Sequence, residues 1–347
     1  MKSSDTPLKK KSLDAKAVKA WASKNAILLV LLALVVVVGI VRPSFLIFDN
    51  LVNIMRISSV RAIIALGVGG ILITRGTDLS AGRTVGLAAC IAASLAQRPD
   101  YVSKLFPDMP LLPLIVPIVA ALGAGLLVGL VNGIIVAFLS VPPFIATLGT
   151  MVMVYGAVSL YVDRPPRGAQ PLGGLREDFT NIGTGTVGPE AFSVPTILLI
   201  AVVIAFLIWV LLNKTRLGKN VYAIGGNPEA AVVSGVNVKR NLLIIYILGG
   251  LLYGLAGVLL AARTGGATNN YGNSYELDAI AAAVIGGVST SGGIGTVGGM
   301  ITGVLIFEVM NNGLVVLGVS AYWQQIVKGL IIVAAVAVDI RKYLRKR

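Results

Sequence analysis

The chain of 347 residues contains no histidine and a single cysteine. Without histidine there is no imidazole base, no histidine metal ligand and no histidine proton relay. The lone Cys90 lies in an apolar run, which excludes a disulfide framework and a cysteine metal cluster, so we expect no metal site. The phosphate-binding pattern G-x-x-x-x-G-K-[ST] is also missing. We therefore expect that this chain does not itself hydrolyse ATP, has no catalytic residue and holds no cofactor.

Charge is scarce as well. Only 13% of the residues are charged, against about 25% in ordinary soluble domains. Hydrophobic residues make up 56% and mean hydropathy is +0.88. Since one membrane-spanning helix needs about 20 mostly apolar residues, this composition could supply roughly ten spans. A soluble enzyme and a disordered chain are both excluded.

Apolar runs along the chain predict an all-α polytopic membrane protein with about ten transmembrane helices. The third and eighth runs are short for full spans, and a broken or re-entrant helix is an alternative there. We expect a short interfacial helix at 44–56 and an irregular loop at 163–193. The ten runs are 25–42, 57–74, 82–97, 112–139, 144–162, 195–213, 241–262, 276–289, 295–316 and 321–340.

The net charge of +14 is concentrated in three segments. These are the N-terminal tail 1–24, the loop 214–240 and the C-terminal tail 341–347, whereas 163–193 carries a net negative charge. Cytoplasmic loops of membrane proteins are enriched in lysine and arginine. We therefore expect both termini and 214–240 in the cytoplasm, 163–193 outside, and no nucleic-acid partner.

Glycine spacing indicates an internal repeat. Two Gly-x-x-x-Gly-x-x-x-Gly triads lie 170 positions apart, in the fourth and ninth runs, and similar polar segments precede the third and eighth runs. The repeat unit is thus five spans, and an odd number makes the second copy enter the membrane from the opposite side. We expect two inverted repeats, at about 25–162 and 195–340, within a membrane domain of 25–340. Because glycines at every fourth position let helix backbones approach closely, we expect helix packing at Gly125, Gly129, Gly133, Gly295, Gly299 and Gly303.

Polar residues inside or beside the apolar runs are candidates for a translocation pathway or gate. The simpler interpretation is a helix cap for Asp78, Ser80, Glu276 and Asp278, and an interhelical hydrogen bond for Asn132. The Asn-rich turn could instead meet a hydroxylated ligand. Glu308, within the ninth run, could be a proton or cation site. The pathway candidates are Asp78, Ser80, Asn132, Asn269, Asn270, Glu276, Asp278 and Trp323, the last of which also fits an interfacial aromatic role.

The loop 214–240 contains the start and stop signals of a short helix. Asn227 suits the N-cap, Pro228 the first helical position, Glu229 the first turn and Gly235 the position after the C-cap. Such a helix could dock in the groove of a partner, or lie on its own bundle or on lipid headgroups.

Three segments resemble the permease subunits of bacterial ABC monosaccharide importers, a family that includes ribose, xylose and galactose transporters. They are Gly76-Thr-Asp-Leu-Ser-Ala-Gly, Asn227-Pro-Glu-Ala-Ala-Val-Val-Ser-Gly-Val, and Tyr275-Glu-Leu-Asp-Ala-Ile-Ala-Ala with Gly286-Gly-Val-Ser. Ile224-Gly-Gly-Asn-Pro-Glu-Ala-Ala, Ala267-Thr-Asn-Asn and Tyr322-Trp-Gln are most similar to its galactose-transporting members. The resemblance covers about 25–345 and leaves the basic tail 1–24 without a role.

This resemblance implies a homodimer in the bacterial inner membrane, a separate cytoplasmic ATPase that binds ATP and Mg²⁺, and a periplasmic sugar-binding protein. It also implies that the short helix contacts the ATPase. The corresponding coupling residues are Gly226, Asn227, Pro228, Glu229, Ala230, Ala231 and Gly235.

Two rival functions remain at this stage. An ion-coupled secondary transporter would use the carboxylates of Asp78 and Glu308. A membrane scaffold or receptor would transport nothing.

Overall fold

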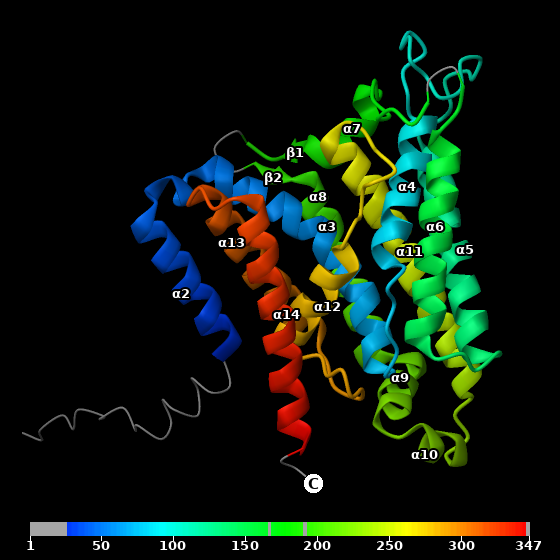
Figure 1. Cartoon of the computed structure of the whole chain (residues 1–347), viewed down its shortest axis with the longest axis vertical. Helices are drawn as coiled ribbons and strands as arrows, with labels where there is room; N and C mark the ends of the chain where they lie inside the picture. The colour runs from blue at the N-terminus through cyan, green and yellow to red at the C-terminus, as the bar shows by residue number, and fades with distance from the viewer. Residues whose placement is uncertain (1–25, 166–167, 190–192, 345–347) are drawn as a thin grey trace, which may run out of the picture.

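The computed structural model describes residues 26–165, 168–189 and 193–344. This part of the chain is almost entirely helical (Figure 1). The one sheet in it pairs β1 (Thr186–Val187) with β2 (Val194–Pro195) in antiparallel register, Thr186 opposite Pro195. The helices are α2 (Ala26–Val41), η1 (Pro43–Leu46), α3 (Phe48–Ile73), α4 (Ala81–Leu95), α5 (Ile115–Ala137), α6 (Pro143–Val162), α7 (Glu177–Thr184), α8 (Thr196–Lys214), α9 (Arg216–Gly226), α10 (Pro228–Val233), α11 (Val238–Thr264), α12 (Tyr275–Ile285), α13 (Val297–Val316) and α14 (Ala321–Leu344).

Each of the ten predicted apolar runs contains a helix. Six of these helices, α3, α5, α6, α8, α11 and α13, are long and apolar enough to cross a membrane. The apolar parts of α2, α4 and α14 are shorter, and α12 has 11 residues. The chain is therefore an all-helical, multi-pass membrane protein, while the number of ten spans stays a prediction. The basic tail 1–24 lies outside the described residues, as do the last three residues of the tail 341–347.

The prediction of a separate interfacial helix at 44–56 is wrong. A single 3-10 turn, η1, follows Arg42, and α3 then runs without a break from Phe48 for 26 residues. Asp49, Asn50 and Asn53 lower the hydropathy at its start but do not interrupt its backbone, since none of them breaks a helix as proline does. Two further short helices, α7 and α9, lie in segments that we expected to be loops.

The long helices α3 and α11 form the buried centre of the bundle. α11 packs against α4 and α5, and α3 packs in the corresponding way against α12 and α13. α5 and α11 touch through their backbones: a Cβ atom built at Gly125 would lie 2.2 Å from the carbonyl oxygen of Gly250. Small residues thus let the backbones of α5 and α11 come into direct contact.

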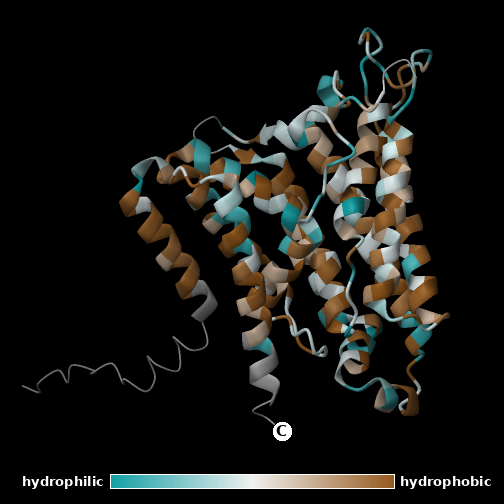
Figure 2. Ribbon diagram, viewed as in Figure 1, coloured by the Kyte–Doolittle hydropathy of each residue, from teal (hydrophilic) through white to brown (hydrophobic). Residues whose placement is uncertain are grey.

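The two ends of the bundle differ. α9, α10 and the C-terminal end of α14 lie at one end, and α7 with the β1–β2 sheet lies at the other (Figure 1). Teal hydrophilic segments are frequent at these two ends, whereas brown hydrophobic segments predominate along the helices between them (Figure 2). This is the distribution expected of a bundle embedded in lipid.

Candidate functional site

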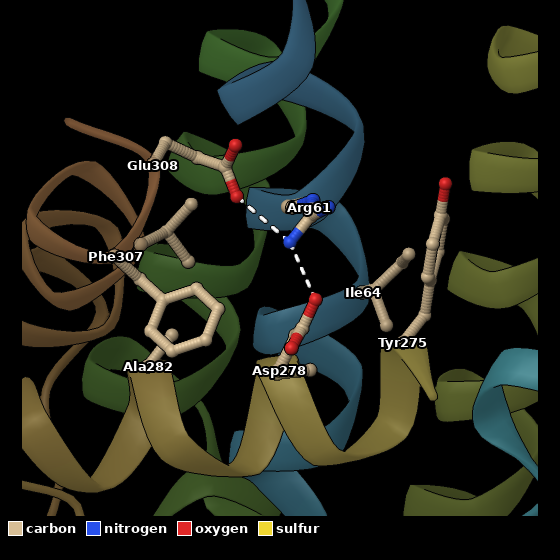
Figure 3. Close-up of a pocket in the computed structure, with 9 residues that line it drawn as sticks. Arg61, Ile64, Tyr275, Asp278, Ala282, Phe307 and Glu308 are labelled. Atoms are coloured by element: carbon tan, nitrogen blue, oxygen red, sulfur yellow. Dashed lines mark hydrogen bonds and ion pairs between the residues drawn. The ribbon is translucent and has the colours of Figure 1, made fainter. Parts of the chain in front are cut away.

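A cluster of four charged side chains joins four helices in the middle of the bundle. Arg61 of α3 lies between two carboxylates: its Nη1 is 2.6 Å from Asp278 Oδ2 and 2.9 Å from Glu308 Oε1 (Figure 3). Lys328 of α14 adds a second cation, with its Nζ 3.2 Å from the same Asp278 oxygen. Two positive and two negative charges thus balance within one cluster, which we call the ion cluster.

The ion cluster is mostly withdrawn from the surface and is framed by aromatic rings. The side chains of Asp278 and Glu308 are only 9% and 5% exposed, and that of Arg61 is 19% exposed. The Arg61 guanidinium lies over the Tyr275 ring at 5.1 Å, and these residues line a small pocket together with Phe307 (Figure 3). Cation–π contact and ion pairing act on the same guanidinium.

Sequence reasoning named the two carboxylates of this cluster but missed both cations. Arg61 and Lys328 each stand inside an apolar run, and an ionisable residue in such a place is by itself a functional candidate. That signal was present in the sequence and could have identified them. Glu308, which by its sequence could be a proton or cation site, lies opposite Arg61.

A second polar group, the Asp78 network, lies where the chain crosses from α3 to α4. Asp78 Oδ1 accepts hydrogen bonds from the backbone N–H of Ser80 at 2.9 Å and from its hydroxyl at 2.6 Å. The side-chain amide of Asn132 in α5 donates to the Ser80 hydroxyl at 2.8 Å. All three side chains are buried, and Asp78 Oδ2 has no hydrogen-bond partner among the described residues.

Arg75 and Arg83, the two arginines nearest to Asp78 in the sequence, point away from its carboxylate. Arg83 donates to Asn273 Oδ1 at 2.7 Å, and Arg75 donates to the carbonyl oxygens at the end of α9. Ser80 is the N-cap residue of α4 by position, but its side chain makes no capping bond. The carboxylate is therefore held by hydroxyl and amide donors rather than by a salt bridge.

The remaining pathway candidates do not join either group. Glu276 lies in the first turn of α12, close against Gly82 of α4. Asn269 donates to the Ser159 hydroxyl at 3.3 Å, and Asn270 is exposed. Trp323 is 62% exposed on α14. Within the described residues no group of three or more metal-ligating side chains occurs.

The glycine triads lie at close helix contacts, with one difference between them. In α5, Gly129 and Gly133 both lie against α11. Gly129 approaches Gly250 and the carbonyl oxygen of Tyr246, and Gly133 approaches Leu243. Gly299 and Gly303 lie against Gly286 and Ala282 at the end of α12. Gly295 precedes α13, so it is a loop residue rather than part of the helix that the pattern predicted.

The segment after α9 forms the short helix that its sequence predicted. Asn227 is the N-cap of α10, and its Oδ1 accepts from the backbone N–H of Ala230 at 2.9 Å. Pro228 begins the helix, and Gly235 follows its end with φ +81°, a conformation that favours glycine. Val232 and Val233 are 59% and 88% exposed, so α10 presents an uncovered apolar face.

The fold and these sites define a multi-pass membrane permease. Residues 50–336 match the family described as branched-chain amino acid transport system, permease component, and the chain belongs to this family. It is thus the non-catalytic transmembrane component of its transport system. No solved structure matches the chain.

Several relatives are similar along nearly their whole length. The chain is 52% identical to the galactose/methyl galactoside import permease protein of Salmonella typhimurium over 97% of this chain and 99% of the relative. It is 53% identical to the protein of the same name from Haemophilus influenzae, over 93% and 96%. Identity to the ribose import permease protein of Escherichia coli K12 is 40%, over 93% and 96%.

Proposed function

We propose that this chain is the membrane-spanning subunit of an ATP-driven importer, and that it carries a monosaccharide of the galactose or methyl galactoside type across the bacterial inner membrane. The observation that carries the proposal is the identity of 52–53% to permeases named for that sugar, against 40% to permeases named for ribose. The similarity covers more than nine-tenths of the chain in each case.

The importer has partners on both sides of the membrane. A separate cytoplasmic ATPase binds ATP and Mg²⁺ and contacts α10, a periplasmic binding protein delivers the sugar, and a second copy of this chain completes a homodimer. The exposed apolar face of α10, between Asn227 and Gly235, supports the ATPase contact. No nucleic acid takes part, since the basic segments act as topological signals of a protein in the lipid bilayer.

The membrane domain, 25–340, consists of ten spans in two inverted five-span repeats. The reciprocal packing of α11 on α4 and α5, and of α3 on α12 and α13, supports two related halves. Both termini and the coupling loop 214–240 are cytoplasmic, and 163–193 is external. The position of α9 and α10 at the end of the bundle opposite α7 supports this topology (Figure 1).

Transport follows alternating access. ATP binding closes the partner ATPases, α10 carries that motion into the bundle, and the two halves rock so that sugar released by the binding protein enters a transient pathway. We assign the ion cluster and the Asp78 network to the pathway or its gate. Buried charges and polar groups within a membrane bundle are costly and are typical of such positions.

The rival ion-coupled mechanism is less well supported. It needs carboxylates that exchange a proton or cation, and Glu308 is paired with Arg61 at 2.9 Å. Asp78 has no cation partner in the part of the chain that the structure describes, but a carboxylate held by Ser80 is equally compatible with a structural role.

The substrate assignment is tested by competition. The chain is reconstituted with its ATPase and binding protein, and uptake of labelled galactose is measured with excess unlabelled galactose, ribose or leucine. We expect galactose to suppress uptake strongly and ribose and leucine to leave it nearly unchanged. Suppression by leucine or ribose as strong as that by galactose would contradict the assignment.

A further inference from the structure

Arg75 occupies an unusual position at the end of α3. Its backbone has φ +65°, a left-handed conformation that few residues other than glycine adopt. The side chain reaches the end of α9: Nε donates to the carbonyl oxygen of Gly225 at 2.8 Å, and Nη2 donates to that of Gly226 at 2.6 Å. These are the last two residues of α9, directly before the N-cap of α10.

Those two carbonyl groups have no partner within their own helix. The last four carbonyls of an α-helix lack an intrahelical donor, and the helix dipole makes this end partially negative. A guanidinium that spans two adjacent carbonyls donates a hydrogen bond to each oxygen, and its positive charge balances the partial negative charge of the helix end. The fork of Arg75 therefore fits the end of α9 specifically.

Neighbouring contacts hold the same ends together. A Cβ atom built at Gly225 would lie 1.7 Å from the carbonyl oxygen of Ile73, so the two backbones touch. Gly293, in the loop between α12 and α13, donates from its N–H to the same Ile73 oxygen at 2.8 Å. Tyr222 of α9 donates from its hydroxyl to Gly295 O at 2.8 Å, and burial raises the pKa of this hydroxyl, which keeps the proton in place.

The loop between α12 and α13 is in turn attached to α14. Asp339 Oδ2 accepts from the backbone N–H and from the hydroxyl of Thr290, both at 2.9 Å. The end of α9 is thus connected to α3, α12, α13 and α14. These are the four helices that contribute Arg61, Asp278, Glu308 and Lys328 to the ion cluster.

We propose that Arg75 is a positioning residue that fastens α10 to α3, so that displacement of α10 is delivered to the four helices of the ion cluster rather than absorbed in the loop. The identification of α10 as the ATPase contact rests on the proposed function. The attachment itself is a property of this chain alone and can be measured without any partner.

The first test measures the position of α10 relative to the bundle. Spin labels are placed at Val233→Cys, 88% exposed on α10, and at Gly298→Cys, in open space in the first turn of α13, with the buried Cys90 replaced by alanine. Arg75→Asn removes the guanidinium but keeps a residue that tolerates the left-handed backbone. Arg75→Lys keeps one charge, and Arg98→Gln is the control because that side chain is exposed and remote.

In lipid nanodiscs we expect a narrow distance distribution for the labelled parent and for Arg98→Gln, a broad one for Arg75→Asn, and an intermediate one for Arg75→Lys. An unchanged distribution in Arg75→Asn would overturn the proposal.

The second test uses the complete transporter. Arg75→Asn should still co-purify with the ATPase, but sugar imported per ATP hydrolysed should fall at least tenfold, because the substitution removes two charge-assisted hydrogen bonds and each corresponds to about tenfold or more. Unchanged sugar imported per ATP, or loss of the ATPase from the complex, would contradict a role in transmission. If the unsubstituted chain showed no ATP-driven uptake, the proposed function would fail, while the distance measurement would still decide the role of Arg75.

Discussion

At the residue scale, the ion cluster holds four charged side chains that are largely removed from water, and burying such charges costs free energy. Arg61 forms ion pairs with two carboxylates, whereas Lys328 forms an ion pair with one, Asp278, among the described residues. Removal of one partner from a buried pair leaves the other charge uncompensated, which costs more than the pair itself contributes. The two cations are therefore not equivalent.

We predict that Arg61→Met lowers the free energy of unfolding by about 3 kcal/mol, because Glu308 then loses its nearest cation. Lys328→Met should cost less, since Asp278 keeps Arg61. Thermal unfolding in detergent, followed by intrinsic fluorescence, checks both variants against Arg98→Met, whose side chain is 53% exposed. A larger loss for Lys328→Met than for Arg61→Met would show that the assignment of roles is wrong.

Sequence reasoning reached half of this cluster. Asp278 and Glu308 stood out because carboxylates in apolar runs are rare. Their partner Arg61 lies 217 positions before Asp278, and no local pattern links two such positions. Only the packing of α3 on α12 and α13 brings them together.

At the element scale, the glycines of α5 provide a matched comparison. A Cβ at Gly125 would lie 2.2 Å from a backbone oxygen of α11, whereas one at Gly123 would meet nothing within 4 Å. We predict that Gly125→Ala destabilises the protein by about 1–3 kcal/mol through overpacking. Gly123→Ala in the same helix should be neutral or slightly stabilising, because alanine is the better helix former. Equal unfolding temperatures for the two variants would contradict this account of the α5–α11 contact.

The cap of α10 leads to a second prediction at this scale. Asn227→Ala removes the bond to the Ala230 N–H and should destabilise the six-residue helix by about 1 kcal/mol. Because α10 is short, we expect less ATPase to co-purify with this variant while membrane insertion is retained. Asn213→Ala, which removes a bond within α8 at an exposed position, is the control. Unchanged recovery of the ATPase would argue against α10 as its contact.

Helix positions were predictable where a long apolar run marks them. α9 was missed because its 11 residues, Arg216–Gly226, mix polar and apolar side chains and therefore form no apolar run. Three of them are glycines, which are poor helix formers. The first part of α3 was assigned to a separate helix because hydropathy falls there, although the backbone continues. The α10 boundaries were predicted because capping residues act locally, within a few positions.

At the scale of the whole molecule, the proposed orientation in the membrane rests on where the basic segments lie along the sequence. Val102 is 99% exposed in the segment between α4 and α5, and Val233 is exposed on α10. In a background with Cys90→Ala, a membrane-impermeant thiol reagent added to intact cells should label Val102→Cys and reach Val233→Cys only after permeabilisation. The opposite pattern would reverse the proposed topology.

The central claim is that this chain moves sugar only as part of an ATP-driven complex. The most direct measurement is uptake of labelled galactose into proteoliposomes that contain the chain alone, the chain with its ATPase, or the chain with both ATPase and binding protein. We predict uptake only in the complete system with ATP supplied on the ATPase side, independent of any proton or sodium gradient. Uptake by the chain alone, driven by an ion gradient and indifferent to ATP, would contradict it.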